Sequence, residues 1–193
     1  MDNRIIFYNK LKELDRASYY AYHLKYQLAP VMMGYKPGMT LSIAKQEKRG
    51  LTQSKAVKII SALDLKVMIL RETPNVFILF IYRKCLIEAI LQDPRKQHIL
   101  KEIGYPIHSV YAALSFLKMR YATLHCPSEI GLFLGFPVDD VKDYMNHTHK
   151  TCLKCGYWQV YNNLSEAEKT FRSYDGAKEN MLSQLLSELV ING

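Results

Sequence analysis

Two thiols stand at the CxxC spacing in the last third of the chain, at Cys152 and Cys155. Two cysteines at this spacing can hold one edge of a metal site, or they can cycle between dithiol and disulfide. His147 and His149 are the upstream imidazoles that could complete a metal site. A strong zinc signature duplicates the cysteine pair, and this chain has one pair. We therefore predict no metal site and keep these four residues as its candidates.

A carboxylate at the start of an apolar segment is a second candidate for chemistry. Glu129 follows Pro127 and precedes a run of apolar residues. In an exposed first turn of a helix, its charge would only stabilise the helix dipole. If Leu132 and Phe133 bury it, the carboxyl group can act as a general acid or base.

A loop near residues 28–39 supplies a cation. Lys36 lies between the turn-forming residues Gly34 and Pro37, on a segment whose backbone can approach a ligand closely. The loop is not a Walker motif, because the GxxxxGK[ST] pattern is absent. A lysine in such a loop can hold a phosphate or carboxylate, or it can simply be exposed to solvent.

Our first functional hypothesis joins these groups into one pocket that binds a small anionic ligand or a protein partner. Lys36 would meet the anion, Glu129 would orient a polar group, and Trp158 would supply a stacking face. The residues expected to line this pocket are Gly34, Lys36, Glu129, Tyr157 and Trp158. The pattern specifies no cofactor.

A Cys/His-dependent enzyme, or a thiol or metal site, is the second hypothesis. Its nucleophile would be Cys126 or Cys155, paired with a histidine such as His125. Glu129 is the remaining catalytic candidate. This reading requires a thiol that reacts faster than a free cysteine at neutral pH.

Nucleic-acid binding is the third hypothesis. The formal charge of +8 favours anionic partners in general, and it also serves solubility. Residues 130–145 have the rhythm of a helix-turn-helix. The second helix would carry Asp139, Asp140 and Asp143, however, and three carboxylates oppose contact with phosphates. We therefore favour a plain αα-corner that bends at Gly135.

Length and composition indicate a single domain over residues 1–193. No segment approaches the ~18 consecutive apolar residues of a membrane span, and the first residues lack the apolar core of a signal peptide. The four cysteines are irregularly spaced, which argues against a secreted disulfide framework. We expect a cytoplasmic protein with reduced thiols.

The elements that must position these groups follow from hydrophobic periodicity and turn signals. Four strands are predicted, over residues 40–44, 66–71, 76–82 and 157–161, and the middle two form a hairpin. An N-terminal helix is predicted over residues 3–26 and ends at Pro30. Helices are also predicted over residues 52–63 and 109–124, with shorter ones around Cys85, expected to be buried, and after Pro94.

The C-terminal segment is predicted to begin with a capping box at Ser165 and Glu168. It pauses near Gly176, and a second helix follows that covers the domain or forms a homodimer surface. Together these elements predict an α+β fold: a small, mainly antiparallel sheet of about four strands packed with several helices. The predicted parts are an N-terminal helix at 1–27, a core at 28–162 and a C-terminal helical segment at 163–193.

Three sequence blocks, LAPVMMGYKPG, EIGLFLGFPVDDV and CGYWQVY, together resemble a bacterial family known as domain-of-unknown-function family 3793. The resemblance covers residues 28–174. The residues that match its pattern are Glu129, Gly131, Gly135, Cys155, Tyr157 and Trp158. A cysteine often stands where this chain has Leu28, and a histidine where it has Ser128, so the Cys–His pair implied for the family is missing here. Cys152 lies outside the pattern. The family has no established activity, so the resemblance implies no function.

Overall fold

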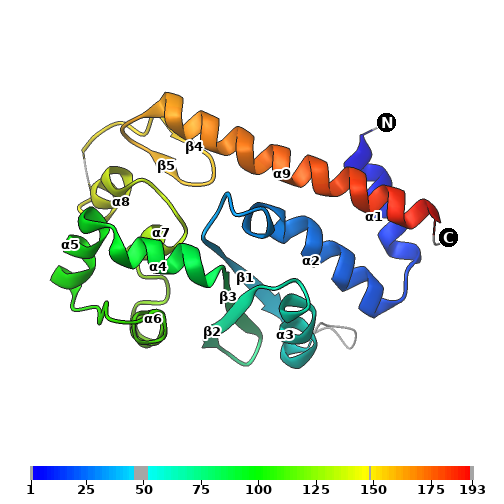
Figure 1. Ribbon diagram of the computed structural model, residues 1–193, viewed down its shortest axis with the longest axis horizontal. Helices are drawn as coiled ribbons and strands as arrows, with labels where there is room; N and C mark the ends of the chain where they lie inside the picture. Colours follow the sequence, from blue (N-terminus) through cyan, green and yellow to red (C-terminus); the bar gives the residue numbers. More distant parts are fainter. Residues whose placement is uncertain (1, 46–51, 148, 192–193) are drawn as a thin grey trace.

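A computed structural model describes residues 2–45, 52–147 and 149–191 of the chain. The helices are α1 (Asn3–Glu13), α2 (Arg16–Met32), α3 (Gln53–Ser61), α4 (Lys84–Gln92), α5 (Pro94–Ile103), α6 (Val110–Leu124), α7 (Ile130–Phe133), α8 (Val138–Met145) and α9 (Leu164–Ile191). The strands are β1 (Gly38–Ala44), β2 (Lys66–Glu72), β3 (Val76–Tyr82), β4 (Lys154–Cys155) and β5 (Gln159–Val160). Many helices around two small antiparallel sheets confirm the predicted α+β class (Figure 1).

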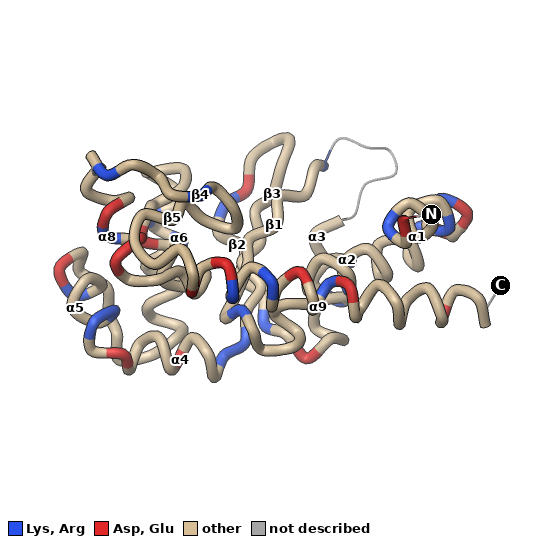
Figure 2. The backbone as a smooth tube through the Cα atoms, turned by 90° about the horizontal axis from the view of Figure 1, so that it is seen from above, with Lys and Arg blue, Asp and Glu red and all other residues tan. Residues whose placement is uncertain are grey.

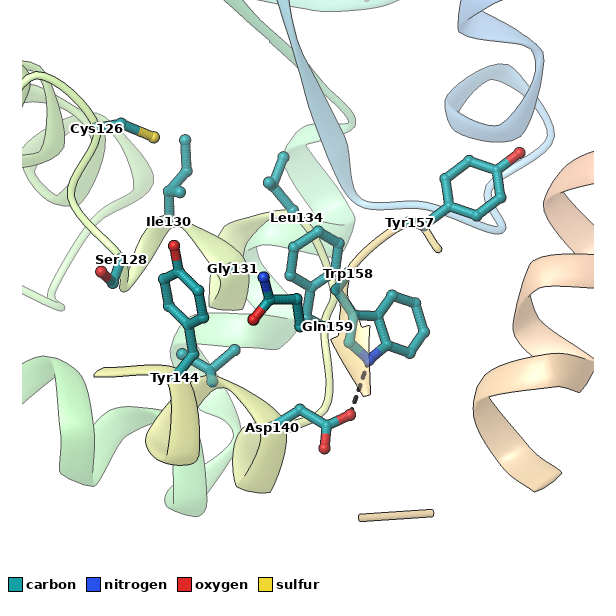
Figure 3. A pocket seen from close by; sticks show the side chains of 12 residues that line it. Cys126, Ser128, Ile130, Gly131, Leu134, Asp140, Tyr144, Tyr157, Trp158 and Gln159 are labelled. Carbon is teal, nitrogen blue, oxygen red and sulfur yellow. Dashed lines mark hydrogen bonds between the residues drawn. The ribbon is translucent and has the colours of Figure 1, made fainter. Parts of the chain in front are cut away.

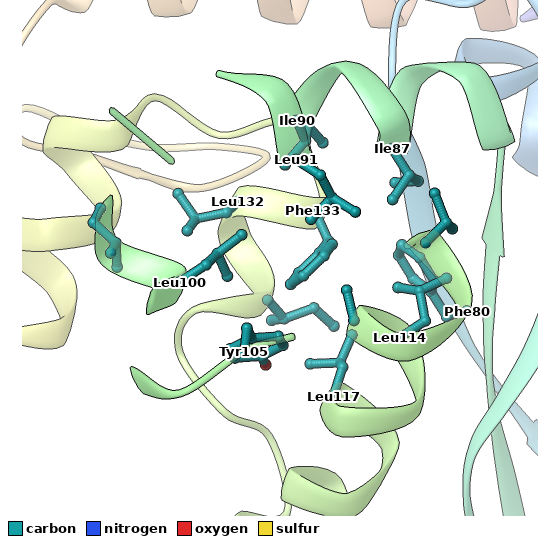
Figure 4. Close-up of a cluster of buried hydrophobic side chains, with 14 of the residues drawn as sticks. Phe80, Ile87, Ile90, Leu91, Leu100, Tyr105, Leu114, Leu117, Leu132 and Phe133 are labelled. Atoms are coloured by element: carbon teal, nitrogen blue, oxygen red, sulfur yellow. The ribbon is translucent and has the colours of Figure 1, made fainter. Parts of the chain in front are cut away.

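The larger sheet has the order β1–β3–β2. The predicted hairpin of β2 and β3 is confirmed, and β3 is the central strand of the sheet. Alternate residues of β3 enter different cores. Phe77, Leu79 and Ile81 pack with α2 and α3, whereas Phe80 packs with α4, α6 and α7. Figure 4 shows Phe80 among the buried side chains of that second core. A strand that is apolar on both faces is stable here because helices cover both faces.

The fourth strand, predicted over residues 157–161, does not join this sheet. β5 is shorter than predicted and pairs with β4 in a separate two-stranded hairpin. The indole of Trp158 packs against the rings of Phe136 and Phe171, with centroid distances of 5.2 and 4.6 Å. These contacts hold the hairpin beside the beginning of α9, away from the larger sheet (Figure 1).

The N-terminal helix begins at Asn3 as predicted, but it is interrupted in the middle and ends later than predicted. It is divided into α1 and α2 by Asp15, whose carboxylate accepts hydrogen bonds from the backbone N–H groups of Ala17 and Ser18. Pro30 does not end α2, which continues to Met32. The last turn persists because its residues, from Leu28 to Val31, are buried, and this burial offsets the backbone hydrogen bond that proline removes.

The C-terminal segment is one continuous helix rather than two. Gly176 lies inside α9, where a glycine costs about 1 kcal/mol relative to alanine. A continuous apolar stripe on α9, which includes Ala177, Met181 and Leu185, packs against α1 and α2 and offsets that cost. The helix begins at Leu164, and the side chain of Asn163 accepts a hydrogen bond from the N–H of Glu166, so the capping residue is not Ser165.

The apolar stripe of α9 is therefore used within the chain, and the helix runs along one side of the molecule toward α1 (Figure 1). α9 has 28 residues, but its opposite face is polar. Over the part of the chain that the structure describes, none of the helices combines the length and hydrophobicity that crossing a bilayer requires.

Cys85 is exposed, which corrects the prediction that it is a buried side chain. It lies in the first turn of α4, whose buried face is formed by Ile87, Ile90 and Leu91. The helical spacing of these three residues places the thiol on the solvent side.

Candidate functional site

A cavity of about 410 Å³ lies between the α7–α8 corner and the β4–β5 hairpin (Figure 3). Its lining is mostly apolar and includes Leu134 and Phe136 from the corner and Tyr157 and Trp158 from the hairpin. Ser128, Tyr144, Gln159 and the thiol of Cys126 add polar groups to the wall. A concave, mainly apolar site with a few polar groups is typical of a small-molecule site.

The corner that forms one wall is built on two glycines. Gly135 ends α7 with a φ of +82°, a left-handed conformation that glycine adopts without strain. A Cβ at this position would lie 2.6 Å from Cδ of Pro37, so the corner packs directly on the loop that carries Lys36. A Cβ at Gly131 would lie 2.8 Å from Cγ2 of Val141, which explains how closely α7 and α8 approach.

Asp140 joins the corner to the hairpin and is only 3% exposed. Its Oδ2 accepts a hydrogen bond from Nε1 of Trp158 at 2.7 Å (Figure 3). Its Oδ1 accepts from the backbone N–H groups of Tyr161 and Asn162, both at 3.0 Å, and from Nδ2 of Asn162 at 2.9 Å. A buried carboxylate with four donors is fully satisfied, so its role is to hold the hairpin in place.

Our sequence interpretation missed this role, because it treated Asp140 as one of three similar acids on a single helix. The indole N–H of the chain's only tryptophan was the available signal, since a buried tryptophan usually finds an acceptor. The other two acids have different partners. Asp139 pairs with Arg95 on the surface, and Asp143 pairs with Lys150.

In the view of Figure 2, basic and acidic residues are scattered among each other along the backbone. The acids of α8 are all engaged by groups of the chain itself. This arrangement favours the αα-corner over a recognition helix, because a recognition helix must present free donors to phosphates and bases.

Lys36, which is only 9% exposed, is the one buried Lys or Arg in the part of the chain that the structure describes. Its Nζ lies 5.6 Å from the ring centroids of Phe136, Tyr157 and Tyr174. No ion pair joins it to an acidic residue within the described parts of the chain. Burial, and secondarily the charge of Lys178, lower the pKa of Lys36 to about 8. The amine is therefore mostly protonated at neutral pH, and the ammonium lies over three ring faces.

Two structural features position this cation. The backbone N–H of Lys36 donates to the carbonyl of Pro30 at 3.0 Å, so the end of α2 fixes the loop. The hydroxyl of Tyr157 donates to Oδ1 of Asp175 at 2.7 Å, which orients the ring toward the ammonium. This bond and burial raise the pKa of Tyr157, with burial the larger cause. Lys178 lies over the same ring, 5.2 Å from its centroid.

Glu129 is buried, at 2% exposure, but it is not among the residues that line the cavity. The hydroxyl of Tyr105 donates to its Oε1 at 2.9 Å, and Nε of Arg120 forms an ion pair with the same oxygen. Burial and the nearby Glu129 carboxylate raise the pKa of Tyr105. The side chain of Glu129 makes no cap for its own helix. The arrangement is a closed charge pair next to the core around Phe133.

The structure thus brings together part of the predicted set. Tyr157 and Trp158 line the cavity, and Lys36 contacts the ring of Tyr157. Gly34 forms the left-handed turn after α2, with a φ of +75°. Glu129 has a separate set of partners, although its neighbour Ser128 lines the cavity.

The predicted thiol and imidazole groups lie in two places. Cys126 is at the cavity edge, where its Sγ is 3.6 Å from the hydroxyl of Tyr121. The adjacent His125 is exposed and ends α6 with a φ of +66°. Within the described residues, the hydrogen-bond partner of the Cys126 thiol is Tyr121, and no hydrogen bond joins the thiol to the His125 imidazole.

Cys152 and Cys155 lie at the hairpin, with their Sγ atoms 3.5 Å apart. His147 and His149 are both exposed. No group of three or more His, Cys, Asp and Glu residues is placed to hold a metal ion anywhere in residues 2–45, 52–147 and 149–191.

Comparison with known proteins gives a family without an activity. Residues 24–192 match a family model described as "Protein of unknown function (DUF3793)", which is the family that the sequence blocks resemble. No curated protein and no solved structure matched the chain. Because the family model covers nearly the whole sequence, the chain belongs to the family of proteins of unknown function DUF3793.

Proposed function

We propose that the protein is a binding module whose cavity takes a small, flat, negatively charged organic molecule. One observation carries this proposal: Phe136 and Tyr157 belong both to the cavity wall and to the ring cluster around Lys36. The cavity therefore has an aromatic wall that is backed by a positive charge without an acidic partner among the described residues.

The cavity has the size and lining that such a ligand needs. Its volume of about 410 Å³ is within the range of small-molecule sites. Aromatic walls favour a planar ligand, because offset stacking adds to simple burial. Ser128, Tyr144 and Gln159 place hydroxyl and amide groups on the wall, where they can orient the polar edge of the ligand.

Electrostatics supply the preference for an anion. A charge close to a site of low dielectric constant acts on a ligand more strongly than it would in water. The ring faces stabilise the ammonium but do not cancel its charge. Asp140 is an acidic residue of the lining, but four donors of the chain itself bind its carboxylate. The charge of Lys36 would therefore favour an acidic ligand in the cavity over a neutral one of the same shape.

The test compares two probes that share a ring system and differ in charge. Anilinonaphthalene sulfonate is anionic, and N-phenylnaphthylamine is its neutral counterpart. We expect both to bind the cavity and quench Trp158 fluorescence, with the anion bound more tightly. Lys36→Met should weaken binding of the anion roughly threefold to tenfold and change binding of the neutral probe less than about twofold.

Two further variants make the test specific. Lys118→Met removes an exposed lysine on α6 and should change neither affinity. Ser128→Phe fills the cavity and should weaken both probes. If Ser128→Phe binds both as wild type does, the probes bind elsewhere and the proposal fails. If Lys36→Met weakens the affinity for both probes equally, the proposed preference for an anion is wrong.

A further inference from the structure

The CxxC pair forms a contact that the proposed ligand site does not use. The Sγ atoms of Cys152 and Cys155 are 3.5 Å apart, and the thiol of Cys152 also lies 3.3 Å from the carbonyl oxygen of Lys154. A disulfide bond is about 2.05 Å long, so rotation of the two side chains through a short distance would bring the sulfurs to bonding distance. Cys155 is exposed and Cys152 is half-buried, so a small oxidant can reach the pair.

We propose that Cys152 and Cys155 form a reversible disulfide by exchange with a low-molecular-weight disulfide, and that this bond fixes the β4–β5 hairpin. The inference concerns the hairpin alone and does not require the proposed ligand.

The surroundings of Cys152 and Cys155 favour a structural disulfide that forms slowly over a catalytic dithiol. Catalytic CxxC pairs have an attacking thiol of low pKa, usually at a helix N-terminus. Here the hydrogen bond with Cys152 raises the pKa of Cys155. The ammonium of Lys154 is directed to Glu168, which it contacts at 2.7 Å, so it is engaged away from the thiols.

The surroundings also argue against a metal held by one copy of the chain. Two thiolates are half of a tetrahedral site. No third His, Cys, Asp or Glu residue completes such a group in the parts of the chain that the structure describes. A disulfide needs only the two sulfurs that are already in contact.

The bond would act on the segment that walls the cavity. Cys155 pairs with Gln159 in the hairpin, and the N–H of Leu153 donates to the carbonyl of Val160 at 2.8 Å. Tyr157 and Trp158 form the turn between the two strands. Joining residue 152 to residue 155 would tether the chain that enters β4 and reduce opening of the hairpin.

The chemistry balances with one equivalent of oxidant. One protein thiol loses its proton, and the resulting thiolate attacks the oxidant disulfide and releases a small thiolate. The second protein thiol, once deprotonated, attacks the mixed disulfide and releases the second small thiolate, so the two electrons and two protons leave with the reduced oxidant. Added dithiothreitol reduces the disulfide to the two thiols and is itself oxidised to its cyclic disulfide.

The experiment treats the full chain with oxidised glutathione and counts reactive thiols by mass spectrometry. We expect wild type to give a peptide cross-linked between Cys152 and Cys155, with a mass lower by two hydrogen atoms, while the exposed thiols Cys85 and Cys126 take no part in the cross-link. Amide hydrogen exchange in residues 153–160 should slow about threefold to tenfold, while exchange in β1–β3 stays unchanged. Cys85→Ser, which removes an exposed thiol on α4, should behave like wild type.

The single variants distinguish the mechanism. Within the pair, Cys152→Ser and Cys155→Ser should each stop at a glutathione adduct on the cysteine that remains, and they should show no slowing of exchange. Four thiols that remain reactive, a disulfide between other cysteines, or a disulfide between two chains would each overturn the proposal. Zinc that co-purifies with the protein and blocks oxidation would also overturn it, in favour of a metal shared between two copies.

Discussion

Glu129 and Lys36 are charged side chains that the fold removes almost completely from water, yet it holds them in opposite ways. Glu129 has a cation and a hydroxyl donor in contact with one carboxylate oxygen. Lys36 has three aromatic rings around its ammonium and no acidic partner in the described structure. The first charge is neutralised inside the chain, and the second is not.

The difference separates a structural charge from a candidate functional one. The desolvation cost of Glu129 is offset by Arg120 and Tyr105, so that site needs no ligand. Ring faces offset a buried ammonium by roughly 0.5–2 kcal/mol, less than the several kcal/mol that burial costs. The remaining cost persists in the unliganded protein, and an anion in the neighbouring cavity would reduce it.

The largest effect is expected when the closed pair is broken. Glu129→Ala leaves the guanidinium of Arg120 without its carboxylate and Tyr105 without its acceptor, and it should destabilise the protein by about 3–5 kcal/mol. Since Arg120 is 25% exposed and can still reach water, we expect a value near the lower limit. Urea denaturation at neutral pH measures the change.

The matched control for this experiment is an exposed pair on a helix. Glu102→Ala removes the partner of His98 on α5, where both side chains are more than half exposed, and should cost less than about 0.5 kcal/mol. A loss below about 1 kcal/mol in Glu129→Ala would mean that the buried pair is not the structural charge described above.

A second, smaller loss of stability is expected when Asp140, the other buried and fully partnered acid, is replaced. Asp140→Ala leaves the indole of Trp158 and two backbone N–H groups without an acceptor, and it should cost about 2–4 kcal/mol. Asp139→Ala removes only the surface pair with Arg95 and should cost less than about 1 kcal/mol. Trp158 fluorescence should change in Asp140→Ala and remain constant in Asp139→Ala. A larger loss of stability in Asp139→Ala than in Asp140→Ala would contradict the structural role of Asp140.

Local sequence signals predicted the elements whose partners are close in the chain. The hairpin of β2 and β3 was predicted from two strand patterns and a short linker at Pro74. The central position of β3 in the sheet was predicted from its two apolar faces. The predictions that a helix ends at Pro30 and pauses near Gly176 were wrong. Burial of the neighbouring residues outweighs the low helix propensity of proline and glycine, which amounts to at most a few kcal/mol.

The site was harder to predict, because it depends on contacts between distant segments. The aromatic residues Tyr157 and Trp158 were identifiable from their own segment. The pairing of Glu129 with Arg120 was not, since it depends on which face of α6 meets α7. Likewise, the sequence placed Lys36 in a loop but gave no sign that Tyr174, from α9, would help to enclose it.

The smallest expected effect is a dependence of stability on pH. This effect tests Lys36 directly. Burial lowers the pKa of Lys36 to about 8 in the folded protein, whereas an unfolded lysine titrates near 10.4. Between these values an unfolded Lys36 binds more protons than the folded one, so the contribution of Lys36 to stability should rise with pH from about 8 to about 10. Lys36→Met lacks this group and should be the more stable protein at pH 7, by at most about 3 kcal/mol. The ring contacts, which favour the charged form, set the actual value below that limit.

Denaturation curves at several pH values give the difference between wild type and Lys36→Met. We expect this difference to shrink as pH rises through the window, and we expect Lys118→Met to show no such trend. A difference that is independent of pH would mean that the ring faces compensate fully for burial, and Lys36 would then be as self-contained as Glu129. In that case the aromatic wall would carry no uncompensated charge to attract an anion.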